Sequence, residues 1–384
     1  MKAAGTDTMK NEIKYEKSEL ELMTTYQLRE ICRREKIMNG VIHPLDKEEL
    51  IQTIMRYMGK RQDFLICDRK KGGEERVEEF LKNTRIVIKP SEELYCQSQI
   101  LAYEGLSIEY YDGYTIPYKK ELSGTNAFLM GSDMTLCAIL NLKEHGGRQE
   151  KLYLTKAAEL ETRETQRKDY RIFCMGRQNS ECMYHLYYGE QTILPEHIEV
   201  YSIPLIDFVV RKPVTLMLPM AIDFGSVNTT AGVYLDSAYF EHVGQQAAIK
   251  NCRENEINYT VFEDGAGESM LLPSVIGVLA VEEEDDKLLF GYDAIRLANA
   301  SYVDEGFCVF YDVKRWIGEY DKEEEIVDRQ GRRRLVKRAE ILRRFFLYII
   351  RKTENRFKCR ISQVHISSPV KQKHYFRRMF REIL

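Results

Sequence analysis

Residues 220–235, MAIDFGSVNTTAGVYL, restrict the fold of this chain more than any other segment. An apolar run ends at Asp223, a turn centred on Gly225 follows, and a second β-type run begins near Thr229. Two such runs around a short turn predict a β-hairpin. A small, hydroxyl-rich turn can present consecutive backbone N–H groups to phosphate oxygens, and a strand-end aspartate can hold Mg²⁺ through ordered waters. A plain hairpin explains the window equally well, so this segment alone leaves both interpretations open.

Four further motifs follow in the chain, at Leu272–Ile276, Phe290–Ala294, Tyr311–Gly318 and Val364–Val370. Together with Asp223–Thr229, and in this order, they resemble the nucleotide-binding domain of the DnaK-type heat-shock chaperones, in the actin–sugar kinase–chaperone superfamily. The resemblance covers 220–384 and nothing before it, and it places the corresponding domain at 219–384. It implies the first lobe of an actin-like ATPase, which is a five-stranded mixed sheet with flanking helices and a ribonuclease-H-like fold.

The resemblance also implies a role for individual residues, with ATP and Mg²⁺ as cofactors. Asp223 would order the Mg²⁺ waters, and Lys314 would be the catalytic lysine that stabilises charge on the transferring phosphoryl group. The phosphate-binding turn would consist of Gly225, Ser226, Val227, Asn228 and Thr229. Residues that relay the nucleotide state would be Arg315, Pro369 and Arg377. The sequence departs from the family at Lys371, where an aromatic residue is usual, and in an acidic insert around 282–286.

The family's second phosphate loop and its adenosine-binding motif have no counterpart in these 384 residues. We therefore expect an N-terminal portion of a longer protein, or a degenerate gene product, that binds nucleotide weakly and does not turn it over alone. The complete protein would couple ATP hydrolysis to binding of a client or co-chaperone. The alternative is a non-enzymatic scaffold that contacts nucleic acid or protein through 19–60 and the basic region 329–384.

The first sixty residues predict a small helical module after a flexible tail over 1–18. Thr24 with Gln27, and Asp46 with Glu49, have the spacing of helix capping boxes. Helix, extended loop and helix over 19–60 resemble a SAP-like domain, with the likeness in Thr25–Glu30 and Lys47–Ile51. That family often binds DNA or RNA. Residues 1–60 hold 11 basic and 10 acidic residues, so a protein-contact or spacer role stays open beside nucleic-acid binding.

The middle of the chain predicts a helix at 73–82, within a helical linker over 61–83, and then a β-rich domain of unknown role over 84–214. Short β-type runs separated by turn residues indicate its strands. These runs are Ile86–Ile88, Leu106–Tyr110, Thr135–Leu140, Lys151–Leu154, Ile172–Met175, Met183–Tyr188, Ile198–Tyr201 and Phe208–Val210. Towards the end of the chain, helical spacing predicts an amphipathic helix over Val336–Lys352 and another over about Gln372–Leu384. The fold class expected is therefore a multidomain α+β protein.

Charge is distributed in two blocks of opposite sign. Residues 329–384 hold 18 Lys and Arg against 3 Asp and Glu, whereas 253–328 hold 6 against 20. We expect the blocks to pair within one fold, the alternative being a basic surface that binds an acidic partner. Nine scattered cysteines without CxxC spacing indicate reduced thiols. A polar N-terminus and the lack of a long apolar run predict a cytoplasmic protein with no membrane partner.

Overall fold

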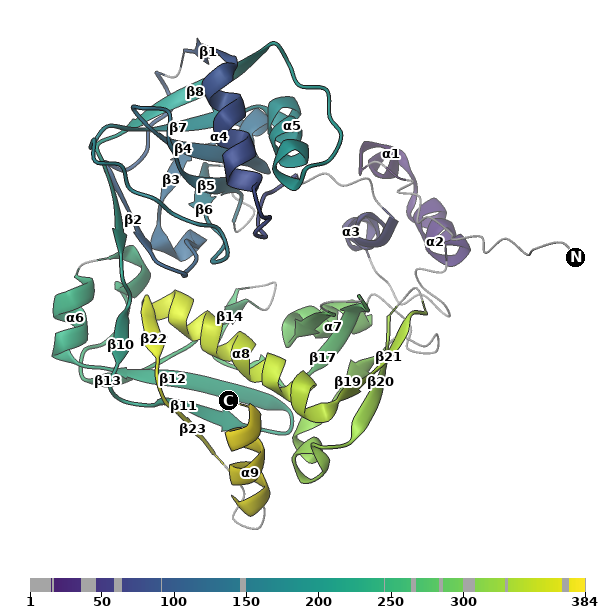
Figure 1. Cartoon of the computed structure of the whole chain (residues 1–384). Coiled ribbons are helices and arrows are strands. Elements are labelled where there is room, and N and C mark those ends of the chain that lie inside the picture. The colour runs from purple at the N-terminus through teal and green to yellow at the C-terminus, as the bar shows by residue number, and fades with distance from the viewer. Residues whose placement is uncertain are drawn as a thin grey trace, which may run out of the picture.

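The computed structural model describes residues 15, 17–35, 46–58, 64–90, 92–145, 150–244, 246–263, 267–282, 286–299, 308–328, 331–367 and 373–383. The protein is a mixed α/β protein. We refer to residues 17–58 as the helical unit, 64–211 as the middle unit and 214–383 as the C-terminal unit (Figure 1). Within the described ranges, no helix is both long and apolar enough to cross a membrane.

The helical unit contains α1 (Lys17–Leu22), α2 (Thr25–Arg34) and α3 (Lys47–Met58). Both predicted capping boxes are confirmed. The Thr24 N–H donates to Gln27 Oε1 over 2.8 Å, while the Gln27 N–H donates back to Thr24 Oγ1. The Asp46 N–H donates to Glu49 Oε2, and the Glu49 N–H donates to Asp46 Oδ1, each over 2.9 Å. The three helices share a small core of their own, made of Leu20, Leu28, Ile31, Cys32, Leu50, Ile51 and Ile54.

A seven-stranded sheet with the order β1-β8-β7-β4-β5-β6-β3 forms the middle unit. All neighbours are antiparallel except β1 and β8, which are parallel. A parallel pair, β2 (Gln99–Tyr103) with β9 (Asp207–Arg211), lies beside it. The sheet strands and helices are β1 (Arg85–Lys89), β3 (Thr115–Pro117), β4 (Thr125–Gly131), β5 (Leu136–Lys143), β6 (Lys151–Thr155), β7 (Tyr170–Met175), β8 (His197–Leu205), α4 (Gly73–Asn83) and α5 (Arg177–Tyr188).

Both faces of this sheet are buried. Ala127 and Leu129 of β4 point into one apolar cluster, and the alternate residues Phe128 and Met130 point into another. Helices α4 and α5 cover the second face (Figure 1). The helix expected at 73–82 is thus present as α4, and it belongs to the core of this unit rather than to a linker.

Two of the expected β runs differ from the structure. The strand expected at Met183–Tyr188 is wrong, because these residues form the second half of α5. Gly176 precedes this helix and Gly189 follows it. Its buried residues, Ser180, Met183, Tyr184 and Tyr187, recur at the spacing of a helix and not at every second position as in a strand. The run Leu106–Tyr110 contributes only a single bridge, between Ile108 and Lys156.

The C-terminal unit is built around a five-stranded mixed sheet with the order β13-β12-β11-β23, in which β16 also pairs with β12. The predicted hairpin is confirmed: β11 (Met220–Phe224) is antiparallel to β12 (Asn228–Leu235), and Phe224 lies opposite Thr229. Strand β23 (Val364–Ile366) lies parallel to β11 on its other side. The sheet is completed by β13 (Glu256–Tyr259) and β16 (Leu272–Pro273).

The remaining elements of this unit surround that sheet. They are β10 (Val214–Leu216), α6 (Ser237–Val243), β14 (Phe262–Glu263), β15 (Glu268–Ser269), β17 (Ile276–Ala280), β18 (Lys287–Phe290), α7 (Tyr292–Asn299), β19 (Val309–Phe310), the 3-10 helix η5 (Val313–Glu319), β20 (Glu323–Val327), β21 (Arg333–Lys337), α8 (Arg338–Phe357), β22 (Cys359–Ile361) and α9 (Lys373–Ile383). Helix α8 agrees with the predicted amphipathic helix and crosses the unit along the sheet (Figure 1). Strands β17 and β18 form a hairpin, and residues 283–285 of the acidic insert at 282–286 lie outside the described residues.

The two charge blocks pair with each other, as expected. Strand β20 carries the acidic residues 323–325 and is antiparallel to the basic strand β21. Arg338 forms ion pairs with Glu319 at 2.8 Å and with Glu324. Arg334 forms an ion pair with Asp286, whose side chain is only 2% exposed. Much of the basic block is therefore neutralised inside the fold.

The end of α8 joins the C-terminal unit to the middle unit. Lys358, the residue after α8, donates from Nζ to Asp112 Oδ2 over 2.8 Å and to the Ser107 carbonyl over 2.9 Å. Asn355 Oδ1 accepts from the Ser107 N–H at 3.1 Å. One helix thus contributes to the core of one unit and to the polar contact with the next.

Candidate functional site

The carboxyl ends of two parallel strands meet at Asp223 and Ser367. Asp223 lies near the end of β11, and Ser367 directly follows β23. Ile222 is in register with Ile366, so the residues that follow them, Asp223 and Ser367, lie next to each other. Ser367 Oγ donates to Asp223 Oδ1. Asp223 is exposed. This carboxylate is therefore oriented by a neighbour and open to solvent, as a group that holds a hydrated cation must be.

The turn after Asp223 is tight and exposed. A Cβ on Gly225 would lie 2.2 Å from the Asn228 carbonyl oxygen, so only glycine fits at this point of the turn. Ser226, Val227 and Asn228 are all exposed, with Val227 at 74%. An apolar side chain this exposed contributes little to packing. Three of the five predicted phosphate-binding residues are therefore exposed on this turn, whereas Gly225 is half-buried and Thr229 is buried and paired with Phe224 and Leu272 in the sheet.

A buried hydroxyl pair holds this turn from below. Ser274 Oγ donates to the Gly225 carbonyl over 2.8 Å and lies 2.8 Å from Thr229 Oγ1. The Ser274 N–H donates to the Val227 carbonyl, also over 2.8 Å. Ser274 and Thr229 are 1% and 0% exposed. Both sides of the turn are therefore tied to one residue of the Leu272–Ile276 motif, although that motif is 45 positions away from Thr229.

Lys314 reaches the same strand end from η5. Its Nζ donates to the Phe224 carbonyl, a contact between residues 90 positions apart in the chain. The ammonium group also lies 5.9 Å from the centroid of the Phe224 ring. Lys314 is half-buried. The predicted cation is therefore placed one residue from Asp223 and one residue from the turn.

Helix α8 supports the turn through aromatic contacts. The Phe224 ring lies 5.1 Å from that of Phe346 in an edge-to-face arrangement and 6.0 Å from that of Phe345. All three rings are fully buried. The floor of the candidate site is thus a packed core, which fixes the position of the turn.

The predicted relay residues are not brought together with this turn. Arg315 forms an ion pair with Asp312 and has a side chain that is 86% exposed. Arg377 lies on α9, where it lines a groove beside β23. Pro369 and Lys371 lie outside the described residues. Asp223, Lys314 and the turn residues form one cluster, whereas Arg315 and Arg377 have other surroundings.

Two residues of this site escaped the sequence interpretation. Ser367 contacts Asp223 through strand register, and only the pairing of two strands over 140 positions apart reveals it. Ser274 belongs to the Leu272–Ile276 motif, but the sequence alone gives this serine no role. In the part of the chain that the structure describes, no group of three or more His, Cys, Asp or Glu side chains is arranged around a metal position.

No family model and no curated protein sequence matches this chain.

Proposed function

We propose that the C-terminal unit is the first lobe of an actin-like, DnaK-type nucleotide-binding domain and holds the phosphates of Mg-ATP at the 225–229 turn. The observation that carries the proposal is the contact of Lys314 with the Phe224 carbonyl. It places a cation next to a strand-end carboxylate, Asp223, and a glycine turn on which Ser226, Val227 and Asn228 are exposed. A cation, a carboxylate and backbone N–H groups are what a magnesium-bound polyphosphate requires.

The sheet topology supports the same proposal. A first strand that is antiparallel to its hairpin partner and parallel to a strand following a long helix is the arrangement that the sequence resemblance implies. In this proposal Asp223 orients the waters of Mg²⁺, the Gly225–Thr229 backbone binds phosphate oxygens, and Lys314 leaves the Phe224 carbonyl to meet the terminal phosphate. Coupling of hydrolysis to a protein partner belongs to the same proposal, as do the relay roles of Arg315, Pro369 and Arg377.

The test is a titration of the ¹⁵N-labelled chain with Mg-ATP, followed through its backbone amide resonances. We expect shifts centred on residues 225–229, which weaken in Lys314→Met and lose their Mg²⁺ dependence in Asp223→Asn. Adenosine is the control ligand, because it has the base and sugar but no phosphate. Equal shifts with adenosine, or shifts that avoid the turn altogether, would contradict the assigned site. In the complete protein, Lys314→Ala should abolish ATP hydrolysis, and hydrolysis that persists unchanged would remove the catalytic role of Lys314.

A second candidate function is a non-enzymatic scaffold, favoured by the surface of the helical unit. Leu22 and Tyr26 are 88% and 70% exposed there, although neither is needed for the small core. Apolar side chains in this position favour a protein contact over a nucleic-acid contact. Gel retardation of a short DNA duplex and an RNA hairpin by the full chain at low salt distinguishes the two. Salt-sensitive retardation would support the SAP-like interpretation, and its absence would leave the protein contact.

A further inference from the structure

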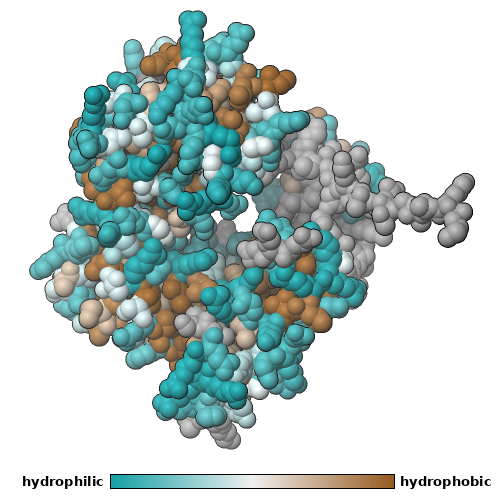
Figure 2. Space-filling view, in the orientation of Figure 1, coloured by the Kyte–Doolittle hydropathy of each residue, from teal (hydrophilic) through white to brown (hydrophobic). Residues whose placement is uncertain are grey.

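A cleft of about 750 Å³ opens between α8, the β17–β18 hairpin and Asp68, which belongs to the segment before α4 in the middle unit. We refer to it as the α8 cleft. Figure 2 shows the surface hollowed between the middle and C-terminal units, with hydrophilic residues on both sides of the opening. Ligand sites in proteins have volumes of about 300–1,000 Å³, so the α8 cleft can hold a molecule rather than a single ion.

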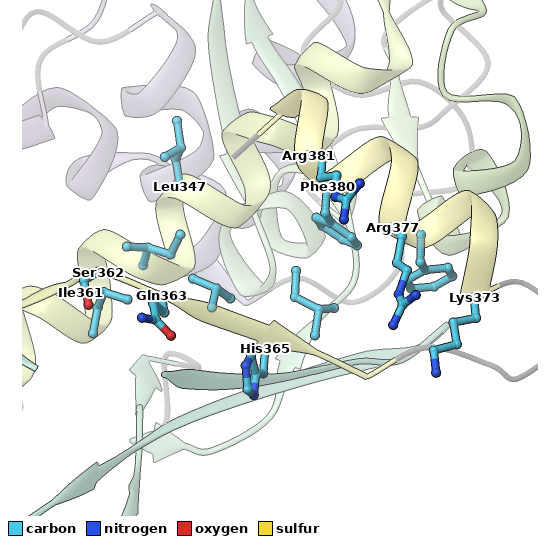
Figure 3. Close-up of a pocket in the computed structure, with 13 residues that line it drawn as sticks. Leu347, Ile361, Ser362, Gln363, His365, Lys373, Arg377, Phe380 and Arg381 are labelled. Carbon is cyan, nitrogen blue, oxygen red and sulfur yellow. The ribbon is translucent and has the colours of Figure 1, made fainter. Parts of the chain in front are cut away.

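The α8 cleft is separate from the groove beside β23. Among the described lining residues, only Leu347 of α8 belongs to both. Figure 3 shows this side chain extending from α8 away from His365 of β23. The α8 cleft therefore lies on the side of the helix that faces the middle unit, and its described lining residues fall between 68 and 355.

Basic side chains outnumber acidic ones in the lining of this cleft. Asp286 is neutralised by an arginine outside it, and Glu340 pairs with arginines of its own helix. The third lining carboxylate, Asp68, is exposed in the middle unit. Arg351 and Lys352 are exposed, and neither forms an ion pair with the residues that the structure describes. The basic residues of the lining are Lys287, Arg343, Arg344, Arg351 and Lys352.

The lining residues of α8 form a row along one face of the helix. Positions 344, 348, 351, 352 and 355 recur every three or four residues, which is the spacing of a single face, and all of them line the cleft. At about 1.5 Å per residue, the row from Arg344 to Asn355 is about 16 Å long. A single phosphate would contact only part of it. An extended polyanion, whose charges repeat along its length, can contact the whole row.

An aromatic and apolar wall lies beside these cations. Phe290 of β18 and Tyr348 of α8 both line the cleft, with ring centroids 5.0 Å apart, and both are half-buried. Further apolar surface comes from Leu279, Leu288 and Leu347. Proteins that bind single-stranded nucleic acids combine a positively charged groove with aromatic side chains that contact the bases. An acidic peptide would use the cations but not the rings, and a duplex keeps its bases stacked inside.

From these features we infer that the α8 cleft binds a single strand of nucleic acid. Its phosphates contact Arg343, Arg351 and Lys352, and its bases lie against Phe290 and Tyr348. No described lining residue belongs to the 225–229 turn, so the inference does not rest on the proposed function.

The probes are two fluorescein-labelled pyrimidine dodecanucleotides, one of DNA and one of RNA, and their binding to the full chain is followed by fluorescence anisotropy. We expect saturable binding at low salt, and weaker binding of the corresponding duplexes. Replacing Arg351 and Lys352 with glutamine should weaken binding at least tenfold. The matched control replaces Lys337 and Arg378 with glutamine, which removes the same charge from exposed residues outside the cleft, and should change binding little.

The salt dependence separates phosphate contacts from base contacts. Each phosphate contact on a single strand contributes about 0.7 to the slope of log K against log salt, so the variant without Arg351 and Lys352 should lose about 1.4. Tyr348→Leu removes a ring but no charge, and it should weaken binding about threefold to tenfold with the slope unchanged. Inorganic polyphosphate of matched charge has no bases and should compete poorly. Circular dichroism and the unfolding midpoint show whether each variant is folded.

Several results would overturn the inference. Full binding by the variant without Arg351 and Lys352 would place the nucleic acid on another surface, such as that of the helical unit. Unchanged affinity of a folded Tyr348→Leu chain, or equal competition by polyphosphate, would show that the cleft attracts charge without contacting bases. Tighter binding of a polyglutamate peptide than of either strand would assign the cleft to an acidic protein segment.

Discussion

Lys358 and Asp112 form a buried ion pair between two units of the chain, with Nζ 2.8 Å from Oδ2 and side chains that are only 3% and 6% exposed. Burial raises the pKa of Asp112, against the opposing effect of the Lys358 charge. The Glu109 N–H also donates to Asp112 Oδ2, over 2.7 Å. Both side chains of the pair therefore have hydrogen-bond partners. Removing either one would leave a buried charge without its counter-ion, which would lower the stability of the fold.

The first prediction concerns this pair. Lys358→Met should lower the free energy of unfolding by about 3–5 kcal/mol, because it leaves a buried carboxylate without its cation. The double variant Asp112→Asn with Lys358→Met should recover most of that loss. The deficit of the single variant should grow as pH rises, because a carboxyl with a raised folded-state pKa loses stability on ionising. Urea unfolding at pH 5 and pH 8 measures the recovery in the double variant and the pH dependence of the single variant. Equal losses of stability in the single and double variants would contradict the role of the ion pair.

The second prediction concerns Lys156, which is 2% exposed and donates only to the neighbouring Ala157 carbonyl among its described contacts. Burial lowers the pKa of Lys156 from 10.5 to about 8. Between these pH values the unfolded chain binds more protons, so stability should rise with pH. At about 1.4 kcal/mol for each pKa unit, the gain from this residue is on the order of 3 kcal/mol. Lys156→Met should be more stable than the wild type at pH 7, with a difference that disappears near pH 10.5.

The third prediction concerns the conformation of the candidate turn. Gly225→Ala should lower the free energy of unfolding by about 1–3 kcal/mol, because the added Cβ requires the Asn228 carbonyl to move. Gly318→Ala is the matched control, since a Cβ there meets nothing within 4 Å. Denaturant melts of both variants make the comparison. Equal effects at the two positions would show that the turn is less tight than the structure has it.

The fourth prediction concerns the hydroxyl pair beneath that turn. Ser274→Ala leaves the Gly225 carbonyl and the buried Thr229 hydroxyl without their common partner, at a cost of about 1–3 kcal/mol. It should also speed amide hydrogen exchange at 225–229. Ser362→Ala, which removes an exposed hydroxyl that donates to the Leu216 carbonyl, should cost less. Unchanged exchange in the Ser274 variant would exclude a role in holding the turn.

Local sequence patterns predicted those elements whose cause is local. The capping boxes at Thr24 and Asp46, the hairpin around Gly225 and the amphipathic stripe of α8 each depend on spacings of a few residues. The pairing of β20 with β21 is also local, because these oppositely charged strands lie on either side of one turn. These features need no knowledge of the distant chain, whereas the ion pair of Arg334 with Asp286 joins residues 48 positions apart.

The features that escaped prediction depend on distant contacts or on complete burial. Strand β4 is buried at every position, so it has no alternation to reveal it. Helix α5 is rich in tyrosine, a residue that favours strands, and only its packing against the sheet decides for a helix. The contacts of Ser367 with Asp223 and of Lys358 with Asp112 join residues 144 and 246 positions apart. No short motif encodes such pairs.

Helix α8 couples the unfolding of the middle unit to that of the C-terminal unit. Phe346 packs under the candidate turn, and Lys358, twelve positions later, is tied to the middle unit; at about 1.5 Å per residue these points are about 18 Å apart. If the chain were divided near residue 212, Asp112 would lose its counter-ion Lys358. The end of α8 would lose its polar partners in the middle unit. The boundary that the sequence predicts between 214 and 219 therefore does not separate two independently stable units, and the middle and C-terminal units should unfold in a single cooperative transition.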